Sequence, residues 1–255
     1  MQTADFTVMV AGVLFGIRSS HESTRTFFKD YILEGEDPAG LPLLEASPGD
    51  LSKAGEAYTR HLAREGRPLP ETVRDPFLEQ TVLHEKMSLA LLQRDIFLMH
   101  GSALSLDGKG YLFTAPSGTG KSTHARLWRE AFGDRAVMIN DDKPYIIWKR
   151  EKETFTLTGS PWMGKHRLGS KREAPLKGIC ILHQAAENRI RRLDAEQAMV
   201  PVLAQVYRPA GREDMRRTLA FIGSLLDRVP VYSMGADMSP EAAEVSRKAM
   251  DRDIS

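Results

Sequence analysis

The stretch Ala115-Pro-Ser-Gly-Thr-Gly-Lys-Ser122 has the form of a phosphate-binding loop. Apolar residues precede it from Tyr111 to Phe113, and a segment with helical spacing follows it from Thr123 to Phe132. This order of strand, glycine turn and helix is the one that a P-loop requires. Glycines in the turn allow backbone N–H groups to converge on an anion, and the following helix adds its positive end. The stretch therefore predicts a nucleotide-phosphate site.

The side chains of this turn have distinct expected roles. Lys121 is placed to reach the β and γ phosphates of ATP, and the Ser122 hydroxyl to enter the Mg²⁺ shell. Ala115 stands where the strict pattern has glycine, so a turn that merely precedes Lys-Ser is the alternative. The residues expected to contact the nucleotide in the turn are Ser117, Gly118, Thr119, Gly120, Lys121, Ser122 and Thr123.

Two acids follow the next apolar segment, Val137-Met-Ile-Asn-Asp-Asp142. We expect this segment to be a strand beside the P-loop strand, so that Asp141 and Asp142 reach the same end of the sheet. One carboxylate can then hold Mg²⁺, directly or through water, while the other accepts a proton from a hydroxyl that attacks the γ phosphate. A solvated Asp-Asp turn is the alternative.

These features together resemble a known family. His100-Gly-Ser102, the loop and the Asn-Asp-Asp segment are similar to the catalytic core of bacterial HPr kinase/phosphorylase and its relatives, which share their nucleotide-binding fold with phosphoenolpyruvate carboxykinase. The resemblance implies an α/β fold: a P-loop kinase domain with a mixed β-sheet flanked by helices, preceded here by a small N-terminal α/β domain. It also implies ATP and Mg²⁺ as cofactors and makes a homo-oligomer possible.

The resemblance also implies individual roles. Asp141 would be the catalytic base, His100 would lie beside Asp141 and tune its charge, and Lys121 would act on the phosphates. Ser122 and Asp142 would bind the metal. His100 as a hydrogen-bonded core residue is the alternative.

A glycine-bounded loop, Gly159-Ser-Pro-Trp-Met-Gly-Lys-His-Arg167, stands where the family has a glutamate- and arginine-rich glycine motif. Lys165 is expected to contact the nucleotide, and Lys165 and Arg167 could stabilise the charge of the transferring phosphoryl group. A solvated surface loop is the alternative.

The expected activity is an ATP-dependent, Mg²⁺-requiring kinase that transfers the γ-phosphoryl group to a hydroxyl. The expected partner is a phosphate-accepting protein or peptide, with serine as the acceptor, or a small-molecule substrate. A non-catalytic nucleotide-binding regulatory module is the alternative, and a phosphoenolpyruvate carboxykinase-like enzyme is less favoured. Retention of Asp141 and Asp142 beside Lys121-Ser122 favours the enzyme, because a sensor has no need of a base.

Composition narrows the remaining classes of function. The 255 residues include 35 Lys and Arg and 34 Asp and Glu, a net charge of +1, which gives no reason to expect a nucleic-acid partner. The apolar stretch from Phe6 to Ile17 is too short to span a membrane and follows Asp5, so we expect no membrane partner and a cytoplasmic location. Cys180 is expected to pack within a strand.

We expect a domain boundary near Asp95, which divides the chain into residues 1–95 and a catalytic domain of residues 96–255. The proline-rich segment Gly66–Pro70 is the alternative boundary. Asp107-Gly108 predicts a two-residue hairpin that joins a strand containing His100 to the P-loop strand. Other expected elements are a helix over 22–33, a helix from about Leu51 capped by Asp50, a helix from Asp194 to about Tyr207, and a short edge strand over 229–232.

Overall fold

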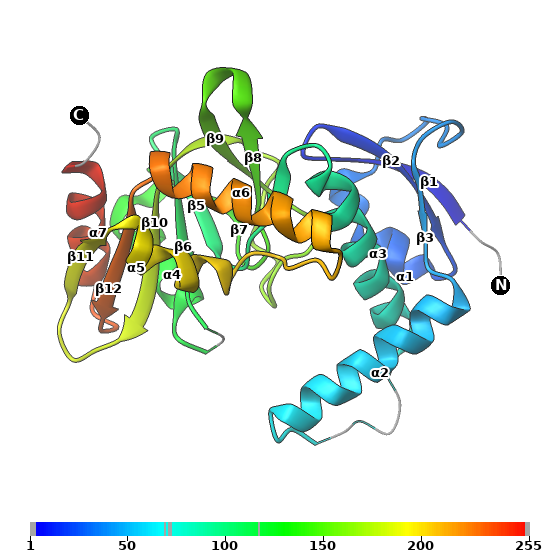
Figure 1. Ribbon diagram of the computed structural model, residues 1–255, viewed down its shortest axis with the longest axis horizontal. Helices are drawn as coiled ribbons and strands as arrows, with labels where there is room; N and C mark the ends of the chain where they lie inside the picture. The colour runs from blue at the N-terminus through cyan, green and yellow to red at the C-terminus, as the bar shows by residue number, and fades with distance from the viewer. Residues whose placement is uncertain (1–3, 69, 71–72, 117, 253–255) are drawn as a thin grey trace. The chain divides into compact units, whose positions relative to one another are not determined.

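In the computed structural model, which describes residues 4–68, 70, 73–116 and 118–252, the chain divides into two units, Met1–Ala90 and Leu91–Ser255 (Figure 1). The division falls within helix α3 (Asp75–Leu92). Each unit has a β-sheet of its own. Among the described residues, no helix is both long and apolar enough to cross a membrane.

The first unit begins with a β-hairpin. β1 (Ala4–Val10) pairs antiparallel with β2 (Val13–Ser19), and β3 (Leu43–Glu45) adds to β2 in parallel. Ala11 and Gly12 both have positive φ, which two-residue hairpin turns of this type require. The side chains that alternate along this strand pair build a small apolar core.

The helices of the first unit begin and end differently from expectation. α1 (Glu22–Phe27) stops early and continues as a 3₁₀ turn, so the helix expected over 22–33 is too long. α2 (Pro48–Arg64) is capped by Ser47, not by Asp50. The Ser47 hydroxyl accepts from the Asp50 backbone, and the Asp50 carboxylate accepts from the Ser47 N–H, which is a capping box. A proline at the first turn starts the helix before Asp50, and this moves the cap to Ser47.

In the second unit, nine strands of the described chain form one mixed sheet. The strands are β4 (Ile96–Leu98), β5 (Ser102–Leu106), β6 (Lys109–Thr114), β7 (Ala136–Asn140), β8 (Tyr145–Lys149), β9 (Thr154–Thr158), β10 (Ala174–Gln184), β11 (Arg189–Leu193) and β12 (Val231–Ala236). The long strand β10 joins the two halves, because its beginning pairs with β9 and the rest of it lies between β6 and β12. The expected hairpin at Asp107-Gly108 joins β5 to β6.

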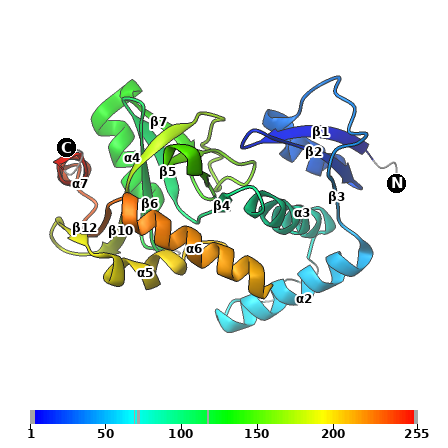
Figure 2. The ribbon, with the colours of Figure 1, turned by 45° about the horizontal axis from the view of Figure 1, so that its top comes forward.

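Helices cover both faces of this sheet (Figure 2). α4 (Lys121–Phe132) and α7 (Glu241–Arg252) pack on one face, and α5 (Ala195–Leu203) and α6 (Arg212–Arg228) pack on the other. Strand β6 shows the expected alternation, since Tyr111 and Phe113 belong to the α4/α7 core while Leu112 belongs to the α5/α6 core. Cys180 is fully buried in β10, as expected, and burial raises the pKa of its thiol.

Three predicted details of this unit are wrong. β7 pairs with β5, so β5 separates it from the P-loop strand β6. β12 is not an edge strand, because Pro230 precedes it and its own residues pair with both β10 and β11. The helix after Asp194 is α5, which ends at Leu203 instead of continuing to about Tyr207.

Candidate active site

Four loops meet at one edge of the second sheet. β10 and β12 run parallel to β6. β7 also points the same way as β6, because both are antiparallel to the strand between them, β5. The segments that follow β6, β7, β10 and β12 therefore leave the sheet at the same edge. The acids reach the end of the sheet that sequence reasoning predicted, although through a different strand order.

Two glycines of the turn have positive φ. Gly118 and Gly120 have φ of 79° and 113°, which a residue with a Cβ rarely adopts. Gly120 precedes the first residue of α4, so the unpaired N–H groups of that helix begin at the turn. Ala115 is fully buried at the end of β6. Ser117, which was predicted to contact the nucleotide, lies outside the described residues.

Lys121 is folded back onto the turn. Its Nζ donates hydrogen bonds to the carbonyls of Ala115, at 2.9 Å, and Pro116, at 3.3 Å. Burial lowers the pKa of this ammonium, and the negative charge of Asp142 opposes that shift in part. The lysine is 9% exposed, and its hydrogen bonds to described residues go to these two carbonyl oxygens. An anion in the turn would be a stronger partner for it.

Asp142 contacts a histidine and a lysine. Its Oδ1 is 3.3 Å from Nε2 of His100, and its Oδ2 accepts from Nζ of Lys143 at 3.0 Å. Burial alone would raise the pKa of Asp142, but the hydrogen bonds and charges of His100 and Lys143 outweigh it and hold the pKa well below its usual range. Asp142 is therefore a stable carboxylate at neutral pH.

His100 differs from prediction in two respects. It lies in the connection between β4 and β5 and not within a strand, and the carboxylate that it contacts is Asp142 and not Asp141. The backbone fixes this position: the His100 N–H donates to the Gln205 carbonyl, and its carbonyl accepts from the Thr114 hydroxyl at the end of β6. His100 thus links the P-loop strand to the Asp142 carboxylate.

Asp141 faces the glycine-bounded loop. Its Oδ1 accepts from the Gly164 N–H at 2.7 Å, and its Oδ2 accepts from the Leu168 N–H at 3.3 Å. The residue is 8% exposed. Because an ionised carboxylate has about four acceptor positions, two backbone donors leave room for a further partner. Asp141 and Asp142 thus have separate partners, as expected of successive side chains that leave a strand end on opposite sides.

Asn140 shapes the turn that carries Asp142 and Lys143, a role that sequence reasoning did not assign. Its buried amide nitrogen donates to the Ser160 carbonyl at 3.1 Å and to the Ser160 hydroxyl at 3.2 Å. Its oxygen accepts from the backbone N–H groups of Asp142 and Lys143. Asparagine at the end of a strand is typical of such a side-chain turn, and this was the available signal.

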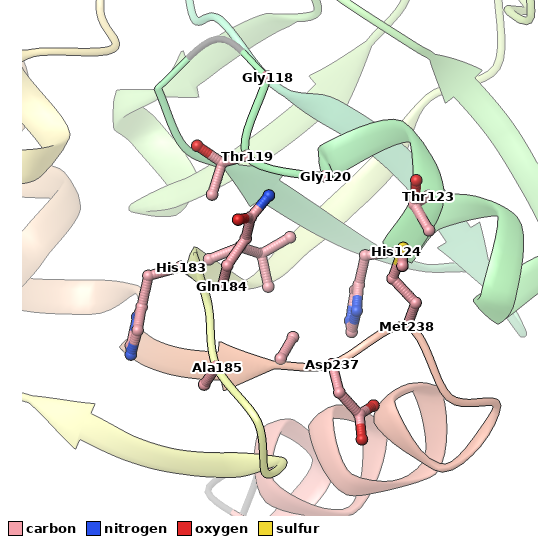
Figure 3. A pocket seen from close by; sticks show the side chains of 12 residues that line it. Gly118, Thr119, Gly120, Thr123, His124, His183, Gln184, Ala185, Asp237 and Met238 are labelled. Atoms are coloured by element: carbon pink, nitrogen blue, oxygen red, sulfur yellow. The ribbon is translucent and has the colours of Figure 1, made fainter.

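Two cavities flank the glycine turn. The first, here called the β10–β12 cavity, has a volume of about 420 Å³ and lies between the turn and the ends of those strands (Figure 3). Gly118, Thr119, Gly120 and Thr123 line it, as do residues from Leu182 to Ala185 and from Ala236 to Met238. Several of the residues predicted to contact a nucleotide are thus brought together.

The second, here called the Asp141 cavity, has a volume of about 500 Å³ and lies on the β5 and β7 side of the turn. Asp141, Ser122 and Lys165 line it together with Thr123 and Ser102. Among the described residues, no group of three or more acidic, histidine or cysteine side chains could hold a metal unaided. A Mg²⁺ site here would need phosphate oxygens as well, which is how proteins usually bind this ion.

His124 is a buried residue that sequence reasoning missed. Its Nε2 is 3.0 Å from the Ser246 hydroxyl oxygen, which also accepts from Trp128 Nε1 at 2.8 Å. His124 Nδ1 is buried and finds no partner in the described part of the chain. Burial lowers the pKa of His124 to about 4, so the ring is neutral. Its position within an otherwise helical, amphipathic segment gave no signal of this role.

Comparison with known proteins gives matches among solved structures only. The sequence matches no protein-family model. It also matches no curated protein. Among solved structures, the chain is similar to the Hpr(Ser) kinase/phosphatase from Coxiella burnetii, with 11% identity and a TM-score of 0.35 over 60% of this chain and 98% of that chain.

Proposed function

We propose that this protein is a Mg²⁺-dependent kinase that transfers the γ-phosphoryl group of ATP to a hydroxyl group. The observation that carries the proposal is the shared sheet edge: the glycine turn after β6 and the acids after β7 lie at the same end, and Ser122 and Asp141 line one cavity. A phosphate-binding turn beside a carboxylate with spare acceptor capacity is the arrangement that phosphoryl transfer to a hydroxyl needs.

The two cavities suggest the direction of the nucleotide. Phosphates in the turn would have Ser122 on the Asp141 side, so the γ phosphate would point into the Asp141 cavity. The nucleoside then extends in the opposite direction, into the β10–β12 cavity. At 420 Å³, that cavity falls within the usual range of small-molecule sites.

The donor atoms near the turn fit Mg²⁺. This ion prefers oxygen ligands, and the Ser122 hydroxyl and the ionised Asp142 carboxylate would hold it together with phosphate oxygens. When bound, it would neutralise negative charge on the β and γ phosphates. His100 and Lys143 keep the Asp142 carboxylate charged and oriented.

In the proposed reaction, the acceptor hydroxyl enters the Asp141 cavity. Its oxygen forms a bond to the γ phosphorus while the bond from that phosphorus to the bridging oxygen breaks, which leaves ADP. Asp141 takes the hydroxyl proton through an acceptor position that Gly164 and Leu168 leave open. Lys121 exchanges its carbonyl partners for phosphate oxygens, and Lys165, at the rim of the cavity, stabilises the transferring group.

The test has two steps. Calorimetry with Mg²⁺ and a non-hydrolysable ATP analogue should show binding that Lys121→Ala weakens at least tenfold, while Lys152→Ala, in an exposed turn, should bind like the wild type. Incubation with γ-labelled ATP and hydroxyl acceptors should then give an acid-stable phosphoester. Binding without any transfer would favour the regulatory module, and absence of binding would overturn the proposal.

A further inference from the structure

The rim of the Asp141 cavity is strongly basic. Arg126 and Arg129 lie one helical turn apart on α4, and Lys165 and His166 lie on the facing loop. All four side chains belong to exposed residues that line the same cavity of about 500 Å³. The floor of the cavity carries Asp141, where the acceptor hydroxyl is proposed to lose its proton.

Most of this positive charge is not neutralised by the protein. Arg126 pairs with Glu130 at 2.6 Å. In the described part of the chain, Arg129 and Lys165 have no carboxylate within ion-pair distance, in contrast to the many surface arginines that do, such as Arg216 with Glu213. Cations that line a cavity without an internal partner are available to a ligand, and guanidinium groups in particular bind carboxylates in a bidentate manner.

Arg129 stands apart from the place expected for the γ phosphate. It is seven residues beyond Ser122 on α4, about 10 Å along the helix axis at the usual rise per residue. Lys165 is assigned to the transferring group, and Arg126, four residues from Ser122, is paired with Glu130. Arg129 is therefore placed to bind a part of the cavity's occupant other than the γ phosphate, which in a kinase is the acceptor.

We infer that the phosphoryl acceptor is a hydroxyl compound that also carries a carboxylate, which Arg129 holds at the outer end of the Asp141 cavity. This inference rests on the proposed function. Two sources share this chemistry: a free hydroxy acid, or a serine or threonine near an acidic residue or a C-terminal carboxylate of a peptide. In both, ion pairing at the rim positions the hydroxyl over Asp141.

The experiment uses the full-length protein and γ-labelled ATP with two sets of acceptors. One set is a serine peptide library with acidic, neutral or basic residues at each flanking position, and the other is a panel of hydroxy acids with their neutral amides. We expect label to concentrate in the carboxylate-bearing members, which tells the two sources apart. Arg129→Gln should lower kcat/KM for an acidic acceptor relative to its neutral counterpart about tenfold, mainly through KM.

Charge reversal and a matched control complete the test. Arg129→Glu should shift the preference toward basic acceptors, while Arg216→Gln, an exposed arginine on α6, should leave the wild-type ratio. Equal labelling of acidic and neutral acceptors would overturn the inference and leave the proposed function standing. Absence of Mg-ATP binding by the wild type, or binding with no labelled acceptor of any kind, would instead overturn the proposed function, and this inference with it.

Discussion

The backbone N–H of Gly164 donates a hydrogen bond to Oδ1 of Asp141, with 2.7 Å between nitrogen and oxygen. A second backbone donor, from Leu168, reaches the other carboxylate oxygen. The proposed catalytic base therefore also anchors the loop that carries Lys165. These two roles can be separated experimentally, because one depends on proton transfer and the other on geometry.

Replacement of Asp141 by Asn should abolish phosphoryl transfer while Mg-ATP still binds. The amide has nearly the same shape as the carboxylate but cannot take a proton, and loss of a general base typically costs 10²- to 10⁴-fold in rate. Rates from γ-labelled ATP and affinities from calorimetry, measured on the same samples, check this. Transfer by Asp141→Asn at the wild-type rate would show that another group is the base.

Replacement of Gly164 by Ala should slow transfer without removing any ionisable group. An added Cβ would lie 3.0 Å from Asp141 Oδ2, closer than ordinary contact, so the loop or the carboxylate must shift. We expect a fall in kcat of about tenfold and little change in Mg-ATP affinity. Gly223→Ala is the matched control, because a Cβ at that position on α6 meets nothing within 4 Å. Equal activity of the two variants would mean that the Gly164 contact does not position Asp141.

Local signals in the sequence predicted the turns of this site but not the order of the strands in the sheet. Asp107-Gly108 forms a hairpin turn because its two residues adopt positive φ. Gly118 and Gly120 also adopt positive φ, which shapes the glycine turn. The insertion of β5 between β6 and β7 has no local signature, since strand order depends on packing of the whole sheet.

The partner of His100 escaped prediction for a related reason. Asp141 and Asp142 are adjacent, so their side chains leave the backbone in different directions, and only the fold decides which one meets the histidine. In the structure, that residue is Asp142, while Asp141 turns toward the loop. The Asn140 side-chain oxygen accepts hydrogen bonds from the backbone N–H groups of Asp142 and Lys143 and so fixes the turn at Asp142. No residue pattern in the sequence specifies this contact.

Asp142→Asn should raise the Mg²⁺ concentration needed for activity. The His100 and Lys143 contacts keep the pKa of Asp142 low, so the wild-type side chain presents a full negative charge to a cation at neutral pH. The amide lacks that charge, and we expect at least a tenfold increase in the Mg²⁺ concentration for half-maximal transfer. ATP binding measured without Mg²⁺ should not weaken, because the substitution removes a negative charge that would repel the phosphates. An unchanged Mg²⁺ dependence would exclude Asp142 as a ligand.

His124 should make the second unit sensitive to mild acid. Its pKa is about 4 in the folded protein because burial disfavours the charged ring, compared with 6.5 for an ordinary histidine. Between these values the unfolded chain binds the additional proton, so stability is fully present above pH 6.5 and falls as the pH decreases toward 4. From pH 6.5 to 5 the loss should be on the order of 2 kcal/mol. Carboxylates with low pKa values, such as Asp142, stay ionised in this window and contribute little to the change.

Urea unfolding followed by tryptophan fluorescence measures this effect, because all three tryptophans, Trp128, Trp148 and Trp162, lie in the second unit. Trp128 reports directly on the surroundings of His124, because its Nε1 donates to the Ser246 oxygen that His124 Nε2 also contacts. His124→Gln keeps a hydrogen-bond donor for Ser246 but cannot gain a proton in this range. The variant should be less stable than the wild type at pH 7.5, and its free energy of unfolding should change much less between pH 6.5 and 5. If both proteins lose stability in parallel over that window, the ring of His124 is not the group that titrates.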